Sequence, residues 1–485
     1  MLGANKEVMN VLLGKMISPS LPRHRQRLHR WSTTLATDAA NKIASIWSHV
    51  PPAPEDAILG LTLAYEADSH PLKVNLGVGA YRDDDGAPVV LPSVREAERR
   101  LLQSRLGMEY LPVAGDARFR YNALRMALCS LDDDSAREAY GTFHESQLPP
   151  AATVQTLSGT GALRLAAEFL RRFAPRTDSA ASTSTSPSVV CLPQPTWSNH
   201  PSVFRDAGLP TMSYRYYDGQ RRTVDIDGML HDLVYRAPPH SVVLLHACAH
   251  NPTGTDLNRQ QWQRVLEVFA ERRRDLLALF DMAYQGFATG DADRDAAAVR
   301  SFVRALSAGG EHGCAGRVLL AQSFSKNFGV YGHRVGALTL FTEDDAAAAA
   351  VESQLKLIAR PMYSNPPLHG ARLVNTVLED AALTQQWRQD VRQMADRIRQ
   401  MRAQLRQLLE ASLPTQNHHP STWSPITDQV GMFCYSGLQP EQVDRLRREF
   451  HVYLTRDGRI SMAGVTRANV AYLAHALATV TDPKT

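Results

Sequence analysis

The sequence has 485 residues, of which 44% are hydrophobic and 21% charged, and a formal net charge of +4 at pH 7. This length allows a large core and more than one domain, and the composition is typical of a soluble globular protein. The small charge excess sits largely in one N-terminal segment, which argues against a nucleic-acid-binding surface. No apolar run approaches the length that spans a bilayer. The five cysteines are scattered without the paired spacing of a metal site, so we expect free thiols, a reducing compartment and no metal.

Residues 8–37 contain no acidic residue, and basic residues accumulate there among Ser, Thr, Leu and Met: Lys15, Arg23, Arg25, Arg27 and Arg30. This composition is typical of an organellar transit peptide, with a disordered basic tail as the alternative. We therefore exclude residues 1–43 from the predicted fold. The segment predicts a mitochondrial matrix protein, with a cytoplasmic one as the alternative.

Three prolines between Trp47 and Leu61 predict an extended arm rather than a helix. In the next segment, residues 74–81, Gly77 and Gly79 suggest a turn where the backbone approaches another group closely. No third glycine opens a helix there, so the nucleotide-binding fingerprint is poor and an ordinary turn is the stronger alternative.

A small-residue turn at residues 155–161 opens a helical pattern. Behind it, apolar residues from Ala162 to Phe173 keep the spacing of a packed helix. Free backbone N–H groups and the positive end of the helix dipole make such a turn a phosphate site. A plain N-cap by Ser158 or Thr160 explains the spacing equally well.

Apolar runs and helical patterns alternate through the middle of the chain. The runs lie at residues 189–192, 241–246, 276–280 and 318–321, and their alternation with helices predicts a mostly parallel sheet covered on both faces. Side chains that can react or hydrogen-bond follow these runs directly: Trp197, Asn251, Asp281 and Lys326. Open α/β sheets keep their ligands at the carboxyl ends of the strands, so we expect these side chains to share one rim.

Lys326 lies in the run Gln322-Ser323-Phe324-Ser325-Lys326-Asn327-Phe328-Gly329. A nucleophilic lysine needs a depressed pKa, which a fixed cation such as Arg334 and partial desolvation can supply. Considered alone, a strand-end lysine that merely reaches solvent is the stronger interpretation. The strand-end residues elsewhere in the chain shift the balance towards chemistry.

The remaining chain predicts a smaller α+β unit. A long charged helix is expected at residues 382–409, followed by short strand and helix patterns, with Arg459 in a strand or turn. Residues 178–188 are almost wholly Ser, Thr, Ala and Pro and are interpreted as a flexible surface loop.

Six motifs stand in register along the chain: Asn75-Leu76-Gly77-Val78-Gly79-Ala80-Tyr81, Ser158-Gly159-Thr160-Gly161-Ala162-Leu163, His250-Asn251-Pro252-Thr253-Gly254, residues 281–288, residues 323–329, and Tyr363-Ser364-Asn365-Pro366-Pro367. In this order they resemble the aspartate aminotransferase group of the fold-type I pyridoxal-phosphate enzymes, from about Trp47 to the C-terminus. The resemblance implies an α/β fold with a mostly parallel central sheet, helices on both faces, a smaller α+β domain and a homodimer. The corresponding ranges are 1–43 (transit or disordered), 44–88 (arm and part of the small domain), 89–393 (large cofactor domain) and 394–485 (small domain).

The resemblance also implies roles for the strand-end residues. Lys326 would hold pyridoxal 5'-phosphate covalently and, once displaced by substrate, transfer a proton. Asp281 would keep the pyridine nitrogen protonated, which makes the ring an electron sink. Tyr284 and Asn251 would hydrogen-bond the phenolic oxygen of the ring, and Trp197 would stack on its face.

The resemblance assigns the cofactor phosphate to residues of one chain: Ser158, Gly159, Thr160, Ser323 and Arg334. Tyr110 would reach the phosphate from the partner subunit. His200 and His246 would support Asp281, with plain core packing as the alternative.

Two arginines are implied to choose the substrate. Arg459 would clamp the α-carboxylate, assisted by the backbone of Gly79, and Arg360 of the other subunit would clamp a side-chain carboxylate. This pair suits transfer of an amino group between L-aspartate and 2-oxoglutarate, giving oxaloacetate and L-glutamate by a ping-pong cycle. The alternatives are a broad-specificity aspartate/aromatic aminotransferase, a lyase or decarboxylase on the same fold, and, least favoured, a non-catalytic binding protein.

Three features depart from the family pattern. His333 stands where a glutamate is usual before Arg334, Met282 replaces a small residue after Asp281, and the Ser/Thr-rich loop around Thr183 is an insertion. None of them removes a reacting group, so they concern the fine tuning of the site.

Overall fold

The computed structural model describes residues 46–53, 58–130, 141–175, 188–271, 276–306, 316–412 and 423–482. The chain forms two compact units, residues 1–55 and 56–485, and every element discussed below belongs to the second. The transit segment and the Ser/Thr-rich loop around Thr183 lie outside the described residues. The division of residues 44–485 into a large and a small domain stays a prediction.

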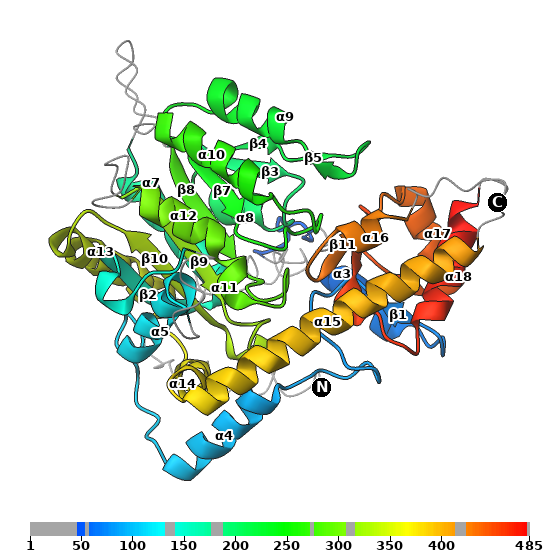
Figure 1. Ribbon diagram of the computed structural model, residues 1–485, viewed down its shortest axis with the longest axis horizontal. Helices are drawn as coiled ribbons and strands as arrows, with labels where there is room; N and C mark the ends of the chain where they lie inside the picture. Colours follow the sequence, from blue (N-terminus) through cyan, green and yellow to red (C-terminus); the bar gives the residue numbers. More distant parts are fainter. Residues whose placement is uncertain are drawn as a thin grey trace, which may run out of the picture. The chain divides into compact units, whose positions relative to one another are not determined.

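A seven-stranded sheet has the strand order β2-β10-β9-β8-β7-β3-β4 (Figure 1). Strand β10 is antiparallel to both of its neighbours, and the pairs β9–β8, β8–β7, β7–β3 and β3–β4 are parallel. The mostly parallel sheet is therefore confirmed. The strands are β2 (Ala151–Leu157), β3 (Val190–Gln194), β4 (Thr211–Arg215), β7 (Val242–His246), β8 (Leu277–Met282), β9 (Val318–Ser323) and β10 (Val335–Phe341).

Successive side chains on the central strands alternate between two apolar cores. Phe280 and Leu320 belong to one core, and Leu279 and Leu319 belong to the other. This follows from the two-residue period of a strand, and it explains why the strands read as continuous apolar runs rather than alternating ones.

Helices contribute to each core, which confirms the expectation of a sheet covered on both faces. The first core includes residues of α9 (Ile226–His231), α10 (Arg259–Glu271) and α12 (Ala297–Leu306), and the second includes residues of α7 (Ser158–Phe173), α8 (His200–Arg205) and α13 (Asp345–Tyr363). A short hairpin, β5 (Tyr217–Asp218) with β6 (Thr223–Val224), extends the chain between β4 and α9.

A third apolar core surrounds α15 (Ala381–Ser412), a single helix of 32 residues. Figure 1 shows it running from α14 (Leu368–Leu378) to α16 (Pro425–Asp428) and α18 (Val470–Thr481). At its first end it also packs on α4 (Pro92–Ser104), which in turn packs on α14, and α14 packs on α5 (Ala117–Leu128). The helix predicted at residues 382–409 is confirmed, with its two ends extended by one and three residues.

Both ends of the second unit contribute to its small sheets. Strand β1 (Val74–Asn75) pairs in parallel with β12 (Val452–Tyr453), and β11 (Phe433–Tyr435) pairs antiparallel with β13 (Arg459–Ser461). Helix α17 (Pro440–Phe450) leads into β12. Arg459 therefore lies in a strand, one of the two possibilities left open by the sequence.

One boundary expected from the sequence is wrong. The extended arm was expected to continue to Leu61, but α3 (Leu59–Ala67) already begins at Leu59. No proline follows Pro54 until Pro71, so nothing in the side chains of this segment prevents the helix from starting there.

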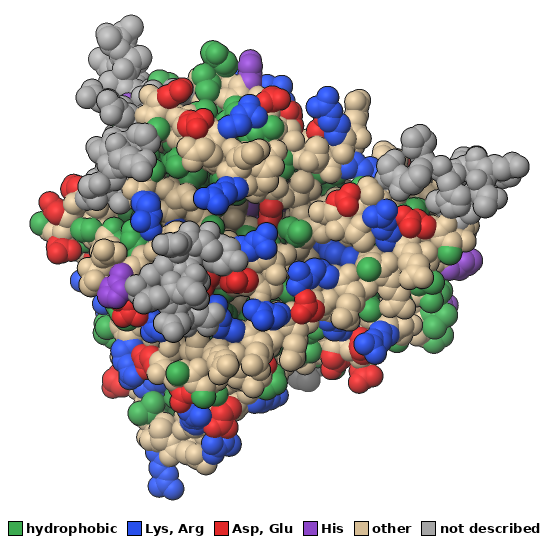
Figure 2. All heavy atoms as spheres, in the orientation of Figure 1, with side chains coloured by type: hydrophobic (Ala, Val, Ile, Leu, Met, Phe, Trp, Pro, Cys, Tyr) green, Lys and Arg blue, Asp and Glu red, His purple; other side chains and the backbone are tan. Residues whose placement is uncertain are grey.

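No helix in the described part of the chain is both long and apolar enough to cross a membrane. On the face shown in Figure 2, basic and acidic side chains are interspersed across the surface. This agrees with the nearly balanced totals of 53 basic and 49 acidic residues.

Gly254 offers a test of how tightly the C-terminal part packs on the loop after β7. Its φ is +64°, and a Cβ placed there would lie 2.5 Å from the Phe433 carbonyl oxygen and 2.9 Å from that of Val430. Gly86 has a φ of +79° with open space around it, so Gly86→Ala isolates the backbone strain, about 1–2 kcal/mol. We expect Gly254→Ala to lower the free energy of unfolding by more than Gly86→Ala in urea denaturation. Equal losses would contradict the close backbone approach.

Candidate active site

The side chains predicted to share one rim line a single cavity of about 150 Å³. The predicted residues that line it are Gly79, Ser158, Gly159, Thr160, Trp197, Asn251, Asp281, Tyr284, Ser323, Lys326, Arg334 and Arg459. Residues not singled out for a site complete the lining: Ile58, Leu163, Ala283 and Phe433. The structure thus brings together residues that lie almost 400 positions apart in the sequence.

The expectation that four of these residues directly follow their strands is wrong. Asp281 does not follow its strand but is the penultimate residue of β8. The other three do not follow their strands directly either, because Trp197, Asn251 and Lys326 come three to five residues beyond β3, β7 and β9. Since these strands are parallel, their loops all leave at the same edge, which accounts for the shared rim.

Asp281 is buried, with 8% of its surface exposed. Burial raises the pKa of its carboxyl, but the hydrogen bond to His200 and the electrostatic interactions with His200, His246 and Lys326 outweigh it and hold the pKa below the ordinary value. The His200 Nε2 lies 3.2 Å from the Asp281 Oδ2. The site therefore contains a buried carboxylate that stays ionised and is suited to a cationic nitrogen.

Two histidines stand behind this carboxylate, as predicted for them. The His200 Nδ1 is 2.7 Å from the Thr196 hydroxyl, and His246 lies opposite Asp281 in the register of β7 with β8. Burial lowers the pKa of His246 to about 3, so its ring is neutral. Ligand atoms of His200, His246 and Asp281 lie within 4.8 Å of one another, a spacing that could also hold a metal ion. The absence of a metal therefore stays a prediction.

Lys326 lines the same cavity as this carboxylate, and its Nζ is 5.1 Å from the centre of the Tyr284 ring. Burial lowers the pKa of Lys326 to about 8, with Asp281 raising it and Arg334 lowering it further. The expected depression is confirmed, together with both of its expected causes. With a pKa of about 8, about one tenth of this amine is neutral and nucleophilic at pH 7.

A cluster of hydroxyl groups lies at the start of α7. The Ser158 Oγ is 3.0 Å from the Ser323 Oγ and 2.8 Å from the Ser325 Oγ, and Arg334 Nη1 donates to Ser325 at 3.3 Å. The N-cap interpretation is wrong, because the N-cap residue is Leu157 and no side chain caps the helix. Hydroxyls, a guanidinium and an uncapped helix start together suit an anionic group such as a phosphate.

Arg459 contributes a buried guanidinium to the cavity lining, with 4% of the residue's surface exposed. It donates to the Gly77 carbonyl oxygen at 2.7 Å and to Asn251 Oδ1 at 3.1 Å, and its plane lies 4.3 Å from the Phe433 ring centre. Its Nε is buried and has no hydrogen-bond partner among the described residues. A buried arginine with donor capacity left over is suited to a carboxylate.

Two predicted site residues, Tyr110 and Arg360, do not line the cavity. Tyr110 is 84% exposed, and Arg360 is an exposed residue of α13 whose Nη1 donates to Ser364 Oγ. Close to Tyr110 in the sequence, Leu102 and Met108 are also strongly exposed. The chain by itself therefore does not bring Tyr110 and Arg360 to the cavity.

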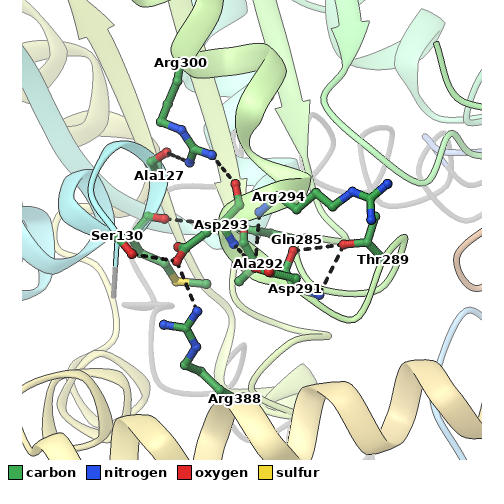
Figure 3. A network of polar contacts seen from close by, with 11 residues as sticks. Ala127, Ser130, Gln285, Thr289, Asp291, Ala292, Asp293, Arg294, Arg300 and Arg388 are labelled. Carbon is green, nitrogen blue, oxygen red and sulfur yellow. Dashed lines mark hydrogen bonds and ion pairs between the residues drawn. The ribbon is translucent and has the colours of Figure 1, made fainter. Parts of the chain in front are cut away.

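The segment after Tyr284 is held by a buried polar network that the sequence did not suggest (Figure 3). Gln285 Nε2 donates to the carbonyl oxygens of Met126 and Ala292, at 2.9 and 3.0 Å. Asp293, in α11 (Ala292–Asp295), accepts from Arg388 of α15 at 3.1 Å, and Arg300 of α12 donates to the carbonyl oxygen of Asp293. The network anchors the loop that carries Tyr284 to α5, α12 and α15.

Sequence reasoning missed several residues of the site. Ser325 stands in the strand-end run, but only its neighbour Ser323 was assigned to the phosphate, although a second hydroxyl two positions on was a usable signal. Gly77, whose carbonyl oxygen accepts from Arg459, was not assigned to the site. Phe433 gave no signal, because an isolated aromatic residue in a short strand reads as ordinary core.

Comparisons with known proteins agree with this geometry. Residues 71–477 match the family model described as aminotransferase class I and II. The mitochondrial aspartate aminotransferase of Arabidopsis thaliana is 49% identical over 440 residues, 90% of this chain and 93% of that protein. An aromatic-amino-acid aminotransferase from Burkholderia pseudomallei, solved covalently bound to pyridoxal phosphate, matches with a TM-score of 0.78 and 41% identity over 90% of this chain and 100% of that one. The cytoplasmic aspartate aminotransferase of Saccharomyces cerevisiae matches with a TM-score of 0.78 and 39% identity over 90% and 98%.

The charges around Lys326 predict how its titration responds to substitution. Asp281→Asn is expected to lower the pKa of Lys326 below about 8, because the carboxylate raises it, and Arg334→Met is expected to raise it, because the guanidinium lowers it. The neutral amine is the form that reacts with cyanate. The pH of half-maximal carbamylation, followed by peptide mass spectrometry in dialysed protein, should therefore be lower in Asp281→Asn and higher in Arg334→Met. Lys356, an α13 residue paired with Glu352, serves as internal control. A midpoint unmoved by either substitution would contradict this electrostatic coupling.

Proposed function

This chain belongs to the class I and II aminotransferase family, and we propose that it transfers an amino group between L-aspartate and 2-oxoglutarate with pyridoxal 5'-phosphate as cofactor. The observation that carries the proposal is the shared cavity. It combines a lysine of depressed pKa, an ionised buried carboxylate and a hydroxyl–guanidinium cluster at a helix start.

The residues of the cavity fit each part of this cofactor. Ser158, Gly159, Thr160, Ser323 and Arg334 would hold the phosphate, with Ser325 added by its hydrogen bonds to Ser158 and Arg334. Asp281 would accept a hydrogen bond from the protonated pyridine nitrogen, and the hydroxyl of Tyr284 and the amide of Asn251 would face the phenolic oxygen. Trp197 lines the cavity with its aromatic ring and would cover one face of the cofactor.

When bound, pyridoxal phosphate supplies an electron sink for the negative charge that develops on the substrate Cα. The chain supplies the proton chemistry. Lys326, with a pKa of about 8, can take a proton at Nζ and release it again near neutral pH. Asp281, ionised despite its burial, stabilises a positive charge next to it throughout.

Substrate orientation would come from Arg459. Its hydrogen bonds to Gly77 and Asn251 fix the guanidinium, and its remaining donors would form a bidentate pair with the α-carboxylate. The side-chain carboxylate of aspartate or glutamate would require a second cation, for which we propose Arg360 of a second copy.

A homodimer would bring Tyr110 and Arg360 of one subunit to the cavity of the other. The exposure of both residues, and of the apolar Leu102 and Met108 close to Tyr110, supports this arrangement. A monomer in sedimentation analysis of the active enzyme would exclude the homodimer.

We also propose a mitochondrial matrix location, supported by the basic, acid-poor residues 8–37 and by the mitochondrial relatives. N-terminal sequencing of protein isolated from mitochondria would check this proposal.

Lys326→Ala tests the central assignment. Removal of the amine is expected to lower transamination by at least about 10²- to 10⁴-fold, because covalent attachment and proton transfer are lost together. Added pyridoxal phosphate should no longer be trapped on the protein by borohydride, as seen by intact mass. Lys356→Ala, on the exposed part of α13, should behave as the unmodified chain. A borohydride-stable adduct that persists in Lys326→Ala would refute the assignment.

Arg360→Ala tests substrate choice. Loss of one partner of a bidentate charge pair is expected to cost about 2–5 kcal/mol in kcat/KM for aspartate. Phenylalanine, which has no side-chain carboxylate, should be affected much less. Equal losses for both donors would dismiss the clamp. If the unmodified chain turns over aspartate and tyrosine comparably, the broad-specificity alternative, favoured by the match to an aromatic-amino-acid aminotransferase, replaces the aspartate-specific one.

A further inference from the structure

Arg402 is a buried cation outside the cavity. It lies on α15 with 2% of its surface exposed, and its guanidinium donates to three backbone carbonyl oxygens and also interacts with the Cys434 thiol. Nη1 donates to Ile426 at 2.7 Å, and Nη2 donates to Gly431 at 2.9 Å and to Phe433. One side chain thus binds three carbonyl groups in residues 426–433, which run from α16 into β11.

The charge of Arg402 is not balanced by a carboxylate, since none of the ion pairs among the described residues includes it. Burial lowers the pKa of this guanidinium. Removing a cation from water is costly, and charge-assisted hydrogen bonds to the three carbonyls offset that cost only while those carbonyls stay in place. Arg402 therefore fixes the positions of the carbonyl groups of Ile426, Gly431 and Phe433.

Phe433, at the end of that segment, lines the cavity. Its ring centre lies 4.3 Å from the Arg459 guanidinium and 5.8 Å from the Tyr284 ring, which it meets edge-on. A Cβ on Gly79 would lie 2.7 Å from the Phe433 Cζ, so the Gly79 backbone also lies close against this ring. Phe433 supports three lining residues at once.

The pairing of β11 with β13 also links the position of the Phe433 backbone to that of Arg459. In the β11–β13 ladder, Phe433 lies opposite Ser461 and Tyr435 lies opposite Arg459. A shift of the Phe433 backbone would therefore move the strand that carries Arg459, as well as the ring beneath its guanidinium. The Phe433 carbonyl that Arg402 binds is the group through which α15 controls both.

We propose that Arg402 is a positioning residue: by holding the Phe433 carbonyl, it keeps the Phe433 ring against Arg459 and so sets the affinity of the cavity for the α-carboxylate of the substrate. It touches neither cofactor nor substrate and acts through Phe433. This inference rests on the proposed function, because it takes Arg459 as the α-carboxylate clamp.

Arg406, one turn further along α15, provides a matched control. It also bonds the segment after α15, donating to Thr427 Oγ1 at 2.7 Å and to Glu410 at 2.6 Å, but it contacts no lining residue of the cavity among the described residues. Arg406→Met removes an arginine that links the same helix to α16 without touching the Phe433 carbonyl. It separates loss of helix anchoring from loss of Phe433 positioning.

The test compares Arg402→Met, Phe433→Leu, their combination and Arg406→Met as cofactor-loaded enzymes. Arg402→Met and Phe433→Leu should each raise KM for aspartate and for phenylalanine about tenfold, the range of a partly desolvated cation–π contact, with kcat changed much less. The Kd of succinate, a dicarboxylate without an amino group, should rise in parallel by calorimetry. The double variant should lose no more than the larger single one, because both substitutions break the same chain of contacts. Arg406→Met should leave KM and Kd unchanged.

The inference is overturned if Arg402→Met leaves KM and the succinate Kd unchanged, if it lowers kcat alone, or if its effect adds fully to that of Phe433→Leu. Should Arg402→Met not fold, Arg402→Lys keeps the charge but loses the planar fork, and it must still raise KM and Kd by a smaller factor. If the unmodified enzyme transfers no amino group, the proposed function fails. The succinate measurement then still decides whether Arg402 controls carboxylate binding.

Discussion

The site depends on burying Asp281 and Lys326 together while Asp281 stays ionised and Lys326 titrates near neutral pH. Burial alone acts against both charges, because it lowers the pKa of the lysine and raises that of the carboxyl. The hydrogen bond to His200 lowers the pKa of Asp281 and helps to outweigh the effect of burial, so the carboxylate stays ionised. Lys326 is left with a pKa of about 8, between a permanently charged amine and a neutral one. An acid held charged beside an amine that titrates near neutral pH is the combination that proton transfer in an aminotransferase needs.

The fold maintains this pair through the alternation of side chains along the strands. Phe280 and Met282 face the core that contains α10 and α12, so Asp281 between them faces the side of α7 and α8. His200 of α8 and Ser158 of α7 lie on that side, and Ser323 follows Ala321 with the same two-residue period on β9. The sheet thus directs its apolar residues into two cores and its polar strand ends into one cavity, and the large buried area of those cores offsets the cost of the buried charges.

The sequence predicted the residues whose chemistry is local and missed those whose role depends on distant contacts. The strands before Lys326 and Asn251 could be predicted from apolar runs, and their common rim followed from parallel pairing. Gly77, Phe433 and Arg402 could not be found in this way, because their partners lie tens to hundreds of residues away. The N-cap interpretation of Ser158 failed for another reason: Ser158 has a φ of +62° and its hydroxyl bonds two other serines, so a residue with N-cap chemistry lines the cavity instead.

The same geometry explains why the departures from the family pattern need not disturb the reaction. Met282 is adjacent to Asp281, but it belongs to the core on the opposite face of the sheet, so its larger side chain changes packing there and not the cavity. His333 precedes Arg334, yet its ring lies 5.3 Å from His369 of α14, and a Cβ on Gly370 would lie 2.8 Å from the His333 Cβ. His333 therefore packs against α14 while Arg334 turns to the serine cluster. Substitutions at such positions alter the support of the site, whereas Asp281, Lys326 and Arg459 all line the cavity.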